Sequence, residues 1–325
     1  MARRYLDQRL KLQMLRVVAT IETSGSILKA AAALGVSQPA LTKTLQELED
    51  IVQLRLFDRH SRGVRVTDAG RQLVRTARTI LAEIARLDEQ LDLLSTPGGG
   101  SVAVGALPVA AAGLLPGVLA RLKAQHPRTQ VRLQQGRTED LLPLLAAGDL
   151  DMIVGRLYAP LVPDGFLREP LWSEPISLLA RSDHPIFGAG EVTVAEIERY
   201  GLVLPTVTQR VGQEIEHALS LLGLTSAQSL RSNSYGFIRE MMHDTDILSI
   251  MPRLLMVGDL LRGALRVVPL SVSTPERPAG LILHRDREIL PAGAAFVEVL
   301  RRYVDEISRQ GLLPPSSLER AHAVA

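Results

Sequence analysis

The spacing of hydrophobic residues changes once along this chain, at Gly98-Gly99-Gly100. Before these glycines the apolar residues recur every three or four positions, which predicts helices. After them, short apolar runs alternate with helical segments, which predicts an α/β fold. With 325 residues, the chain is also too long for one ordinary core. We therefore expect a mainly helical N-terminal part, a flexible linker over 96–100 and a larger α/β part.

A helix-turn-helix is predicted within the first 50 residues. Residues 11–22 place apolar side chains at helical spacing. Ser26 can cap a second helix, which Gly35 ends because glycine adopts the left-handed conformation without strain. Ser37 can then cap a third helix. Two short helices joined by a tight turn that contains a glycine are typical of DNA-binding helix-turn-helix proteins.

The third helix is predicted to have one buried and one exposed face. Leu41, Leu45 and Leu48 share one face, which would pack on the two preceding helices. The opposite face is polar, with Gln38 and Thr42 beside its N-terminal end. A narrow polar face at the start of a helix suits entry into the major groove of DNA.

A short basic β-hairpin is predicted directly after this helix. Val64 and Val66 alternate with Arg65, as in a strand, and Arg62-Gly63 is the expected turn. A hairpin beside a helix-turn-helix is a wing, and its natural targets are phosphates or the minor groove. The alternative is a solvated basic loop. The arginines that would contact DNA are Arg59, Arg62 and Arg65.

The distribution of charge agrees with contact between the N-terminal part and a polyanion. The chain carries a formal net charge of +2, but residues 1–78 hold 14 Lys/Arg against 7 Asp/Glu, and the remainder holds 23 against 28. A basic head on a mildly acidic body is typical of nucleic-acid-binding proteins. Ordinary surface charge is the alternative when charge is taken alone.

A long helix is predicted from Thr67, its candidate N-cap, to residue 95. Its apolar residues alternate in steps of four and three, which is the heptad spacing of a coiled coil. Such a seam favours a dimerising linker helix, and the alternative is a helix that lies on its own domain. The seam residues are Leu73, Ala77, Ile80, Ile84, Leu87, Leu91 and Leu94.

The C-terminal part is predicted to form two α/β lobes with doubly wound sheets. Strands are expected at 102–105, 131–133, 151–155, 176–180, 202–204, 247–250, 265–268 and 280–284, and helices at 111–124, 138–147, 209–222, 235–243 and 291–309. The chain crosses between the lobes, which predicts a hinged cleft. In such sheets ligands bind beyond the carboxyl ends of the strands.

Several polar residues follow the predicted strands and begin the predicted helices, where free N–H groups favour an anion. Arg156, with Arg137 or Arg210, could hold a carboxylate. Alternatively, Arg156 belongs to an ion pair, Arg210 is solvated, and Thr138 and Ser232 are plain N-caps. The full set of candidate effector residues is Leu107, Pro108, Arg137, Thr138, Arg156, Thr206, Arg210, Ser232 and Asn233.

Residues 30–43, 45–49, 56–59 and 66–70 resemble the LysR-type transcription regulators. The resemblance continues through Gly148–Asp151 and Ile250–Pro252, which is nearly the whole chain. It implies a winged helix-turn-helix, a dimerising linker helix and a two-lobed effector domain like that of periplasmic binding proteins. It also implies a homotetramer on promoter DNA, with a small ligand and RNA polymerase as further partners.

The resemblance assigns the DNA contacts by position. Gln38 would read a base edge, whereas Lys43 and the arginines would bind phosphate. Two departures stand out: Ile27 replaces a usual phenylalanine, and Val52-Gln53 replaces a usual Leu-Gly. The contact residues carried over are Gln38, Pro39, Thr42 and Lys43 of the recognition helix and Arg59, Arg62 and Arg65 of the wing.

The surroundings of Gly155-Arg156-Leu157 and Glu174-Pro175 are similar to the subgroup that regulates protocatechuate catabolism or sugar-binding proteins. An aromatic acid is therefore the first expected effector, and a neutral sugar the second. The resulting domain boundaries are 1–66 for the winged helix-turn-helix, 67–95 for the linker helix, 96–100 for the flexible linker, 101–172 with 273–310 for lobe I, 173–272 for lobe II and 311–325 for a tail.

Enzymes and membrane proteins are disfavoured. No catalytic set can be named, the seven histidines lack zinc-ligand spacing, and the absence of cysteine excludes thiolate chemistry. We therefore expect no cofactor and no metal. No apolar run of about 18 residues and no secretory signal is found, so a cytoplasmic protein without membrane contact is expected. A solute-binding receptor is a remote alternative, which the basic head argues against.

Overall fold

The protein is described by a computed structural model, which covers residues 6–60, 63–95, 100–158, 164–188, 192–206, 210–224, 229–270 and 276–313. The chain divides into two compact units, Met1–Pro97 with Leu142–Leu150 and Gly98–Leu141 with Asp151–Ala325. The helices and strands of the N-terminal part are α1 (Leu6–Arg9), α2 (Leu12–Ser24), α3 (Ile27–Ala33), α4 (Gln38–Val52), β1 (Phe57–His60), β2 (Gly63–Val66) and α5 (Asp68–Ser95).

The predicted helix-turn-helix is formed by α3 and α4, which pack on α2 around one core. Leu41, Leu45 and Leu48 of α4 are buried in this core, at most 1% exposed. Helix α3 is followed by Gly35 in a left-handed conformation, with φ +65°. Helix α4 is capped by Ser37, whose Oγ accepts a hydrogen bond from the Ala40 N–H. The local signals in the sequence therefore form the predicted elements.

The end of α4 explains one departure from the family pattern. Gln53 has φ +56°, and its N–H donates to the Glu49 carbonyl, as a left-handed C-cap does. The turn therefore keeps the conformation that glycine adopts without strain, although a side chain is present. A left-handed residue with a Cβ costs about 1–2 kcal/mol.

The predicted hairpin is confirmed, since β1 pairs antiparallel with β2. The Glu49 carboxylate accepts a hydrogen bond from the Leu56 N–H at 2.7 Å, which ties α4 to the entry of the hairpin. The Val64 N–H donates to the Gly25 carbonyl, so the second strand is held against the turn between α2 and α3. The hairpin is thus fixed to the helix-turn-helix from both sides.

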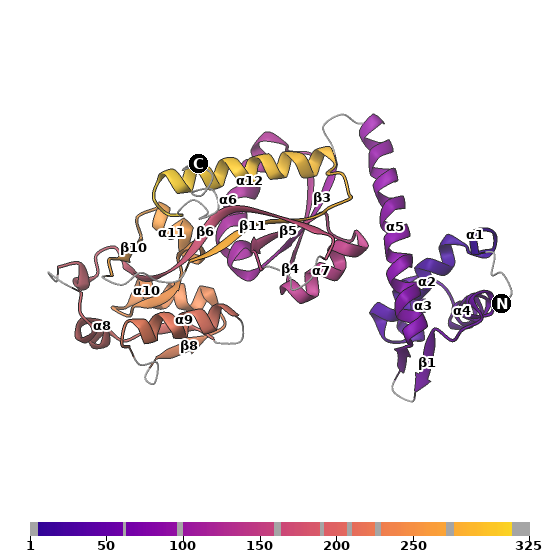
Figure 1. The fold of residues 1–325 in the computed structure, drawn as a ribbon, viewed down its shortest axis with the longest axis horizontal. Coiled ribbons are helices and arrows are strands. Elements are labelled where there is room, and N and C mark those ends of the chain that lie inside the picture. The colour runs from indigo at the N-terminus through magenta and orange to yellow at the C-terminus, as the bar shows by residue number, and fades with distance from the viewer. Residues whose placement is uncertain are drawn as a thin grey trace. The chain divides into compact units, whose positions relative to one another are not determined.

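The C-terminal part is an α/β structure that contains the predicted strands and helices in their expected order, together with several short elements that were not predicted (Figure 1). Its elements are β3 (Ser101–Ala106), η1 (Ala110–Leu114), α6 (Leu115–Gln125), β4 (Gln130–Gln135), α7 (Thr138–Ala147), β5 (Met152–Arg156), β6 (Phe166–Arg181), η2 (Pro185–Gly188), α8 (Val194–Tyr200), β7 (Val203–Pro205), α9 (Arg210–Leu221), β8 (Leu230–Ser232), α10 (Tyr235–Asp244), β9 (Ser249–Pro252), η3 (Arg253–Met256), α11 (Val257–Leu261), β10 (Leu265–Val268), β11 (Glu276–His284) and α12 (Pro291–Arg309).

One strand joins the two predicted lobes. In the main sheet the strand order is β10-β6-β11-β5-β3-β4, and β9 also pairs with β6. The first half of β6 pairs with β11, and its second half pairs with β9 and β10. Strand β6 therefore passes through the predicted lobe boundary at 172–173 without a break. Strands β3, β4 and β5 are parallel, whereas β6 and β11 run antiparallel to their neighbours.

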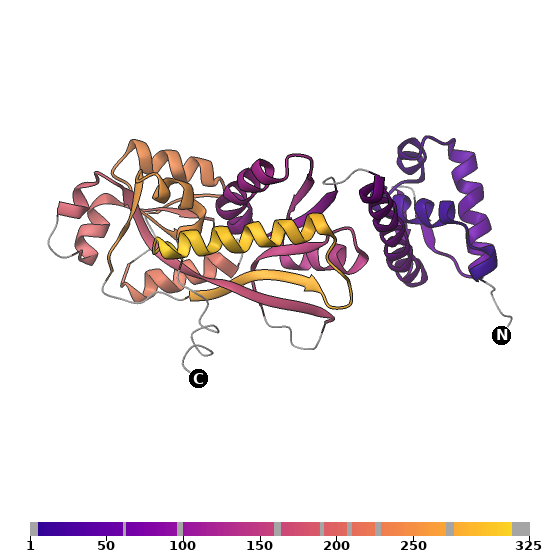
Figure 2. The same ribbon diagram turned by 90° about the horizontal axis from the view of Figure 1, so that it is seen from above.

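A single hydrophobic core extends across both predicted lobes. It includes Val104 and Phe296 from the first lobe and Ile238 and Leu265 from the second. Helix α12 lies along the sheet and packs on β3 and β6 (Figure 2). A second core lies under α8 and α9. Because a wide opening of the lobes would expose this shared core to water, rearrangements of the unit are expected to be small.

The lobes also meet through backbone. Segment η1 is one turn of π-helix, and a Cβ on its Gly113 would lie 1.8 Å from the Leu254 carbonyl oxygen of η3. Only glycine permits this approach. Among the described residues, no helix is long and apolar enough to span a membrane.

Candidate DNA-binding face and effector site

The outer face of α4 is open within its own domain. Gln38, Pro39 and Lys43 are exposed and Thr42 is half-buried, opposite the buried leucines. Pro39 and Lys43 therefore lie on the face away from the core, and Gln38 and Thr42 flank that face. The face starts at the helix N-terminus, where the helix dipole favours a phosphate.

The described part of the wing places one predicted arginine at the surface. Arg65 of β2 is exposed and lies directly opposite Asp58 of β1 in the register. The two opposed residues carry opposite formal charges. The side chain of Arg59 and the whole of Arg62 lie outside the described residues.

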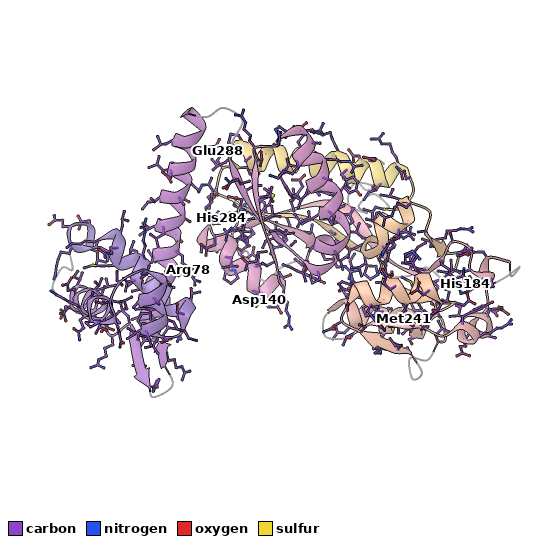
Figure 3. All side chains as sticks on the ribbon, turned by 180° about the vertical axis from the view of Figure 1, so that it is seen from behind. Arg78, Asp140, His184, Met241, His284 and Glu288 are labelled. Atoms are coloured by element: carbon purple, nitrogen blue, oxygen red, sulfur yellow. The ribbon has the colours of Figure 1, made fainter. Side chains whose placement is uncertain are left out.

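Helix α5 packs on its own domain in its first half and has exposed leucines in its second half, so each of the two alternatives for it describes one half. Thr67 caps the helix, since its Oγ1 accepts a hydrogen bond from the Gly70 N–H at 3.0 Å. The first half of the seam lies on the protein's own core, where Ala77 is buried and Leu73 and Ile80 are partly buried. Arg78 of α5, labelled in Figure 3, donates to the Glu22 carboxylate of α2 at 2.6 Å.

The described apolar residues in the second half of the seam are more exposed to solvent than those in the first half. Leu87 and Leu91 are 54% and 55% exposed, and Ile84 is partly exposed. The side chain of Leu94 lies outside the described residues. The prediction of a coiled-coil seam over the whole helix is therefore wrong for Leu73, Ala77 and Ile80, because these residues complete the helix-turn-helix core. The side chains of Leu87 and Leu91 are exposed to solvent within this chain.

In the C-terminal unit, the register of three strands places a polar cluster on one face of the sheet. Ala279 of β11 lies opposite Arg156 of β5 on one side and opposite Trp172 of β6 on the other. The next pair with the same orientation is Arg277 and Glu174. Directly opposed residues of antiparallel strands share a face, so all these side chains point the same way.

Arg156 is paired with two carboxylates. The Arg156 guanidinium donates to Glu174 through Nε and to Glu214 of α9 through Nη1. It can cross β11 because Ala279, which lies between the strands, has only a methyl group. Arg277 donates through Nε to the other oxygen of Glu214 at 3.1 Å. Arg156 and Glu174 are almost fully buried, at 2% and 0% exposed, whereas Arg277 is 54% exposed.

These four residues, Arg156, Glu174, Glu214 and Arg277, form a network that we call the hinge network. It links both predicted lobes at the carboxyl end of β5. The alternative that assigned Arg156 to an ion pair is therefore confirmed. Arg156 does not offer the uncompensated positive charge that a carboxylate clamp requires, because two glutamates already neutralise it.

Three polar atoms on this face have no hydrogen-bond partner among the described residues. They are Arg156 Nη2, Trp172 Nε1 and Glu174 Oε1, all with less than 1 Å² of exposed surface. Tyr235, at the start of α10, is close enough to respond to Glu174. Burial and the negative charge of Glu174 raise the pKa of the Tyr235 hydroxyl, which therefore stays protonated at neutral pH.

The other predicted effector residues of the first lobe follow the carboxyl ends of β3 and β4, which are parallel to β5 in the same sheet. Leu107 and Pro108 follow β3 and are half-buried, and a Cβ on Gly155 would lie 2.6 Å from the Leu107 Cβ. Arg137 is 56% exposed and lies 3.8 Å from Glu139. These residues do not contact Arg156 through any described hydrogen bond or ion pair.

The residues predicted on the second lobe lie near α10. The Thr206 N–H donates to the Ser232 carbonyl, and Asn233 is exposed. Ser234, and not Ser232, caps α10. Thr138 is the first residue of α7 and so is not its cap. The two N-cap assignments are therefore wrong by one or two positions. The side chain of Arg210 lies outside the described residues.

Glu214, Arg277 and Trp172 were missed by sequence reasoning. They come from α9, β11 and β6, and only the register of β6 and β11 brings them to Arg156. No local pattern marks them, because their spacing in sequence is long and irregular. Glu174 itself was noted in the sequence only as part of Glu174-Pro175, directly before the predicted strand 176–180.

Comparison with known proteins assigns both parts of the chain. Residues 12–71 match the family described as "Bacterial regulatory helix-turn-helix protein, lysR family", and residues 95–305 match the family described as "LysR substrate binding domain". The chain is a LysR-type transcription regulator. The expected family, the expected fold class and the preference for a regulator over an enzyme are thereby confirmed.

The similarity of this LysR-type regulator to individual relatives extends over nearly its whole length. The regulator PcaQ of Agrobacterium fabrum is 28% identical over 303 residues, which is 93% of this chain and 97% of PcaQ. The structure of a full-length OxyR variant from Pseudomonas aeruginosa has a TM-score of 0.62 at 23% identity and covers 91% of this chain and 94% of its own.

The chain is also similar to a structure of another regulator bound to DNA. Full-length CbnR complexed with its target DNA has a TM-score of 0.60 at 20% identity, and it covers 90% of this chain and all of CbnR. At such identities the two structures establish the fold alone. The regulator described here is therefore a DNA-binding protein with an effector-binding domain, by family.

Proposed function

We propose that this regulator reads promoter DNA with the outer face of α4 and with its wing, and that a small molecule bound beside the hinge network modulates this binding. The observation that carries the proposal is the polarity of α4. Its leucines are buried in the core, while Gln38, Pro39 and Lys43 are exposed at its N-terminal end. A helix with this arrangement can enter the major groove without unfolding any part of its domain.

The residues of α4 suit different parts of the duplex. Gln38 can make two hydrogen bonds to an adenine edge, and Thr42 can contact the methyl group of thymine. Lys43 suits a phosphate, which carries no sequence information. Arg59, Arg62 and Arg65 of the wing are proposed as further phosphate or minor-groove contacts.

The assembly follows from the exposed half of the α5 seam. Leu87 and Leu91 would pack against the same residues of a second copy, which gives a homodimer through the linker helix. A homotetramer of two such dimers would contact two neighbouring DNA segments. This assembly is proposed by analogy with the family.

Two chemical classes of effector follow from the sequence, a small carboxylate such as an aromatic acid and a neutral sugar. Candidate contacts for either class are the predicted residues Leu107, Pro108, Arg137, Thr138, Arg156, Thr206, Arg210, Ser232 and Asn233. The pairing of Arg156 with Glu174 and Glu214 supports the neutral class, because a carboxylate would have to displace one of the glutamates.

The proposal is tested by footprinting the full-length protein on the DNA beside its own gene. We expect a protected site whose affinity falls steeply with salt, since several phosphates are neutralised on binding. An affinity for this DNA no higher than for random DNA of equal length would contradict promoter recognition. A change of the footprint on addition of an aromatic acid or a sugar identifies the effector class.

A further inference from the structure

The turn between α2 and α3 is joined to the wing. Gly25 ends α2 in the left-handed conformation, with φ +62°, and its N–H donates to the Ile21 carbonyl. The Gly25 carbonyl accepts a hydrogen bond from the Val64 N–H of β2 at 3.2 Å. A Cβ on Gly63 would lie 2.6 Å from the same oxygen, so the backbone of the wing lies directly on the turn. The turn therefore holds the wing to the helix-turn-helix.

The linker helix α5 contacts the last turn of α2, directly before Gly25. Arg78, labelled in Figure 3, donates through Nη2 to the Glu22 carboxylate at 2.6 Å and to the Thr23 hydroxyl at 3.1 Å. The Thr23 hydroxyl donates in turn to the Ala19 carbonyl of the same helix at 3.0 Å. The dipole of α2 disfavours a carboxylate near its C-terminal end, and the cation of Arg78 offsets this effect at Glu22.

Arg78 is the directional part of a contact that is otherwise apolar. Val74 and Ala77 of α5 are buried in the core that α5 shares with α2, at 5% and 0% exposed. The hydrophobic effect is non-directional, whereas a charge-assisted hydrogen bond requires its two groups at a defined separation and angle. The guanidinium that Glu22 and Thr23 share therefore fixes how α5 crosses α2 more narrowly than the apolar contact alone does.

A small change in this crossing angle has a large effect at the far end of α5. Leu87 and Leu91, the exposed residues of the proposed dimer seam, come nine and thirteen residues after Arg78. Leu91 therefore lies about 20 Å along the helix from Arg78. A tilt of about 10° would move Leu91 by about 3 Å, which is close to the ~3.4 Å rise of one base pair. In a dimer joined at these leucines, such a tilt changes the distance between the two recognition helices.

We infer that Glu22 and Arg78 are positioning residues for DNA recognition: their ion pair fixes the direction of the linker helix and thereby the spacing of half-sites that a dimer of this regulator accepts. This inference rests on the proposed function, since it requires DNA reading by α4 and pairing through α5. Dimeric helix-turn-helix proteins read two half-sites at a separation that the geometry of the protein sets. At 26% and 34% exposed, the pair contributes little to stability, and a role in stability alone would leave the spacing unchanged.

The test measures the affinity of the full-length protein for its footprinted site and for duplexes in which one or two base pairs are inserted or removed between the two halves of that site. The wild type should prefer the original spacing. Glu22→Gln and Arg78→Gln should each lower this preference about two- to fivefold, the factor expected for a partly exposed ion pair. The double variant should be no worse than either single variant, because both substitutions remove the same interaction.

The two single variants change the charge in opposite directions, which separates geometry from electrostatics. Glu22→Gln makes the N-terminal part more basic and should strengthen binding to all DNA, whereas Arg78→Gln should weaken it. A loss of spacing preference in both variants is then an effect of the lost ion pair and not of net charge. Arg75→Gln is the matched control, because Arg75 is exposed on the same helix and carries the same charge, and this variant should keep the wild-type preference.

Thermal unfolding and sedimentation velocity of the same samples show which variants are folded and associated as the wild type is. Unchanged spacing preference in a folded Glu22→Gln or Arg78→Gln variant would overturn the inference, and so would an equal loss in Arg75→Gln. A wild type that binds its site but accepts every spacing equally would refute this inference alone. A wild type that binds its site no better than random DNA would refute the proposed function, and this inference with it.

Discussion

At the scale of single residues, the two most informative positions are ones where the chain departs from what its local structure favours. Gln53 is the one described residue other than glycine with a positive φ. Arg156 is a cation at 2% exposure inside an apolar sheet. The first position concerns backbone strain, and the second concerns charge that is removed from water.

Replacing Gln53 by glycine should stabilise the helix-turn-helix. Glycine adopts the left-handed conformation without strain, although it also gains freedom in the unfolded chain, so we expect a net increase of about 0.5–1 kcal/mol in the free energy of unfolding. Urea unfolding measures this change. The control is Gln46→Gly in the middle of α4, which should destabilise by about 1 kcal/mol. A loss of stability for both variants would show that Gln53 is not strained.

Removing the charge of Arg156 should be costly, because Glu174 would remain buried without its main cation. We expect Arg156→Gln to lower the free energy of unfolding by about 3–5 kcal/mol. Glu174→Gln in the same chain should recover part of this loss, since it removes the orphaned charge. Urea unfolding of both single variants and the double variant measures the coupling. Strictly additive effects would mean that the pair does not interact as the structure describes.

Which single residues the sequence predicts depends on whether the signal is local. Ser37 and Thr67 are caps because their hydroxyls bond the N–H three residues later, and a local pattern suffices to find them. Glu214, by contrast, lies 58 residues from Arg156 and 63 residues from Arg277 in sequence, so the three meet only through tertiary structure. No pattern of spacing contains that information.

At the scale of elements, α10 and α11 are joined by one buried carboxylate. Asp259 of α11 is 3% exposed and accepts hydrogen bonds from Arg239 at 2.7 and 2.8 Å and from Arg262 at 3.0 Å. Burial alone would raise the pKa of Asp259, but the bonds from the two arginines outweigh it, so this pKa is lowered. The ionised carboxylate thus connects the two helices.

This arrangement predicts a pH dependence that belongs to these helices. Because the folded-state pKa of Asp259 is lowered, its contribution to stability is present above its unfolded pKa near 4 and is lost as the pH falls through the folded value. The difference in unfolding free energy between wild type and Asp259→Asn should therefore shrink as the pH is lowered from 7 to below 4. Urea unfolding at several pH values measures it. A constant difference would contradict the lowered pKa.

Most of the longer elements were predictable, but the short elements α1, η2, α8, β8, η3 and α11 were not expected, and β6 and α5 differ from their predictions. Periodicity predicts the helices and most strands because each buries one face. Strand β6 is longer than predicted, 166–181 rather than 176–180, because the residues before 176 include Arg168, Glu169 and two prolines instead of an apolar run. Helix α5 was predicted as one uniform seam, but its first half packs on α2, and heptad spacing does not distinguish the two situations.

At the scale of the whole molecule, the exposed end of α5 predicts the state of association. Replacing both Leu87 and Leu91 by lysine should shift the protein toward monomers, since two apolar positions of the proposed dimer seam become charged. Sedimentation velocity measures this shift. Leu221→Lys on α9 is the control, because this leucine is also exposed, at 46%, but lies outside the seam. An unchanged dimer in the double variant would place the interface elsewhere.

The shared core of the C-terminal unit bears on how a ligand acts. Residues of both predicted lobes contribute to one cluster, and Gly113 packs against the η3 backbone. A ligand that binds this unit is therefore expected to stabilise the arrangement already present rather than close a wide cleft. Ligand binding is therefore expected to raise the thermal stability of this unit with little change in its dimensions.

The claim that α4 reads DNA sequence is tested most directly by one ratio, the affinity of the protein for its footprinted site divided by its affinity for a scrambled duplex at the same salt concentration. Lys43→Ala should weaken both affinities by the same factor, because phosphate contacts carry no sequence information. Gln38→Ala should lower the ratio by an amount equivalent to about 1–3 kcal/mol, the value of a bidentate contact to a base. An unchanged ratio for Gln38→Ala, with both affinities reduced equally, would contradict the account.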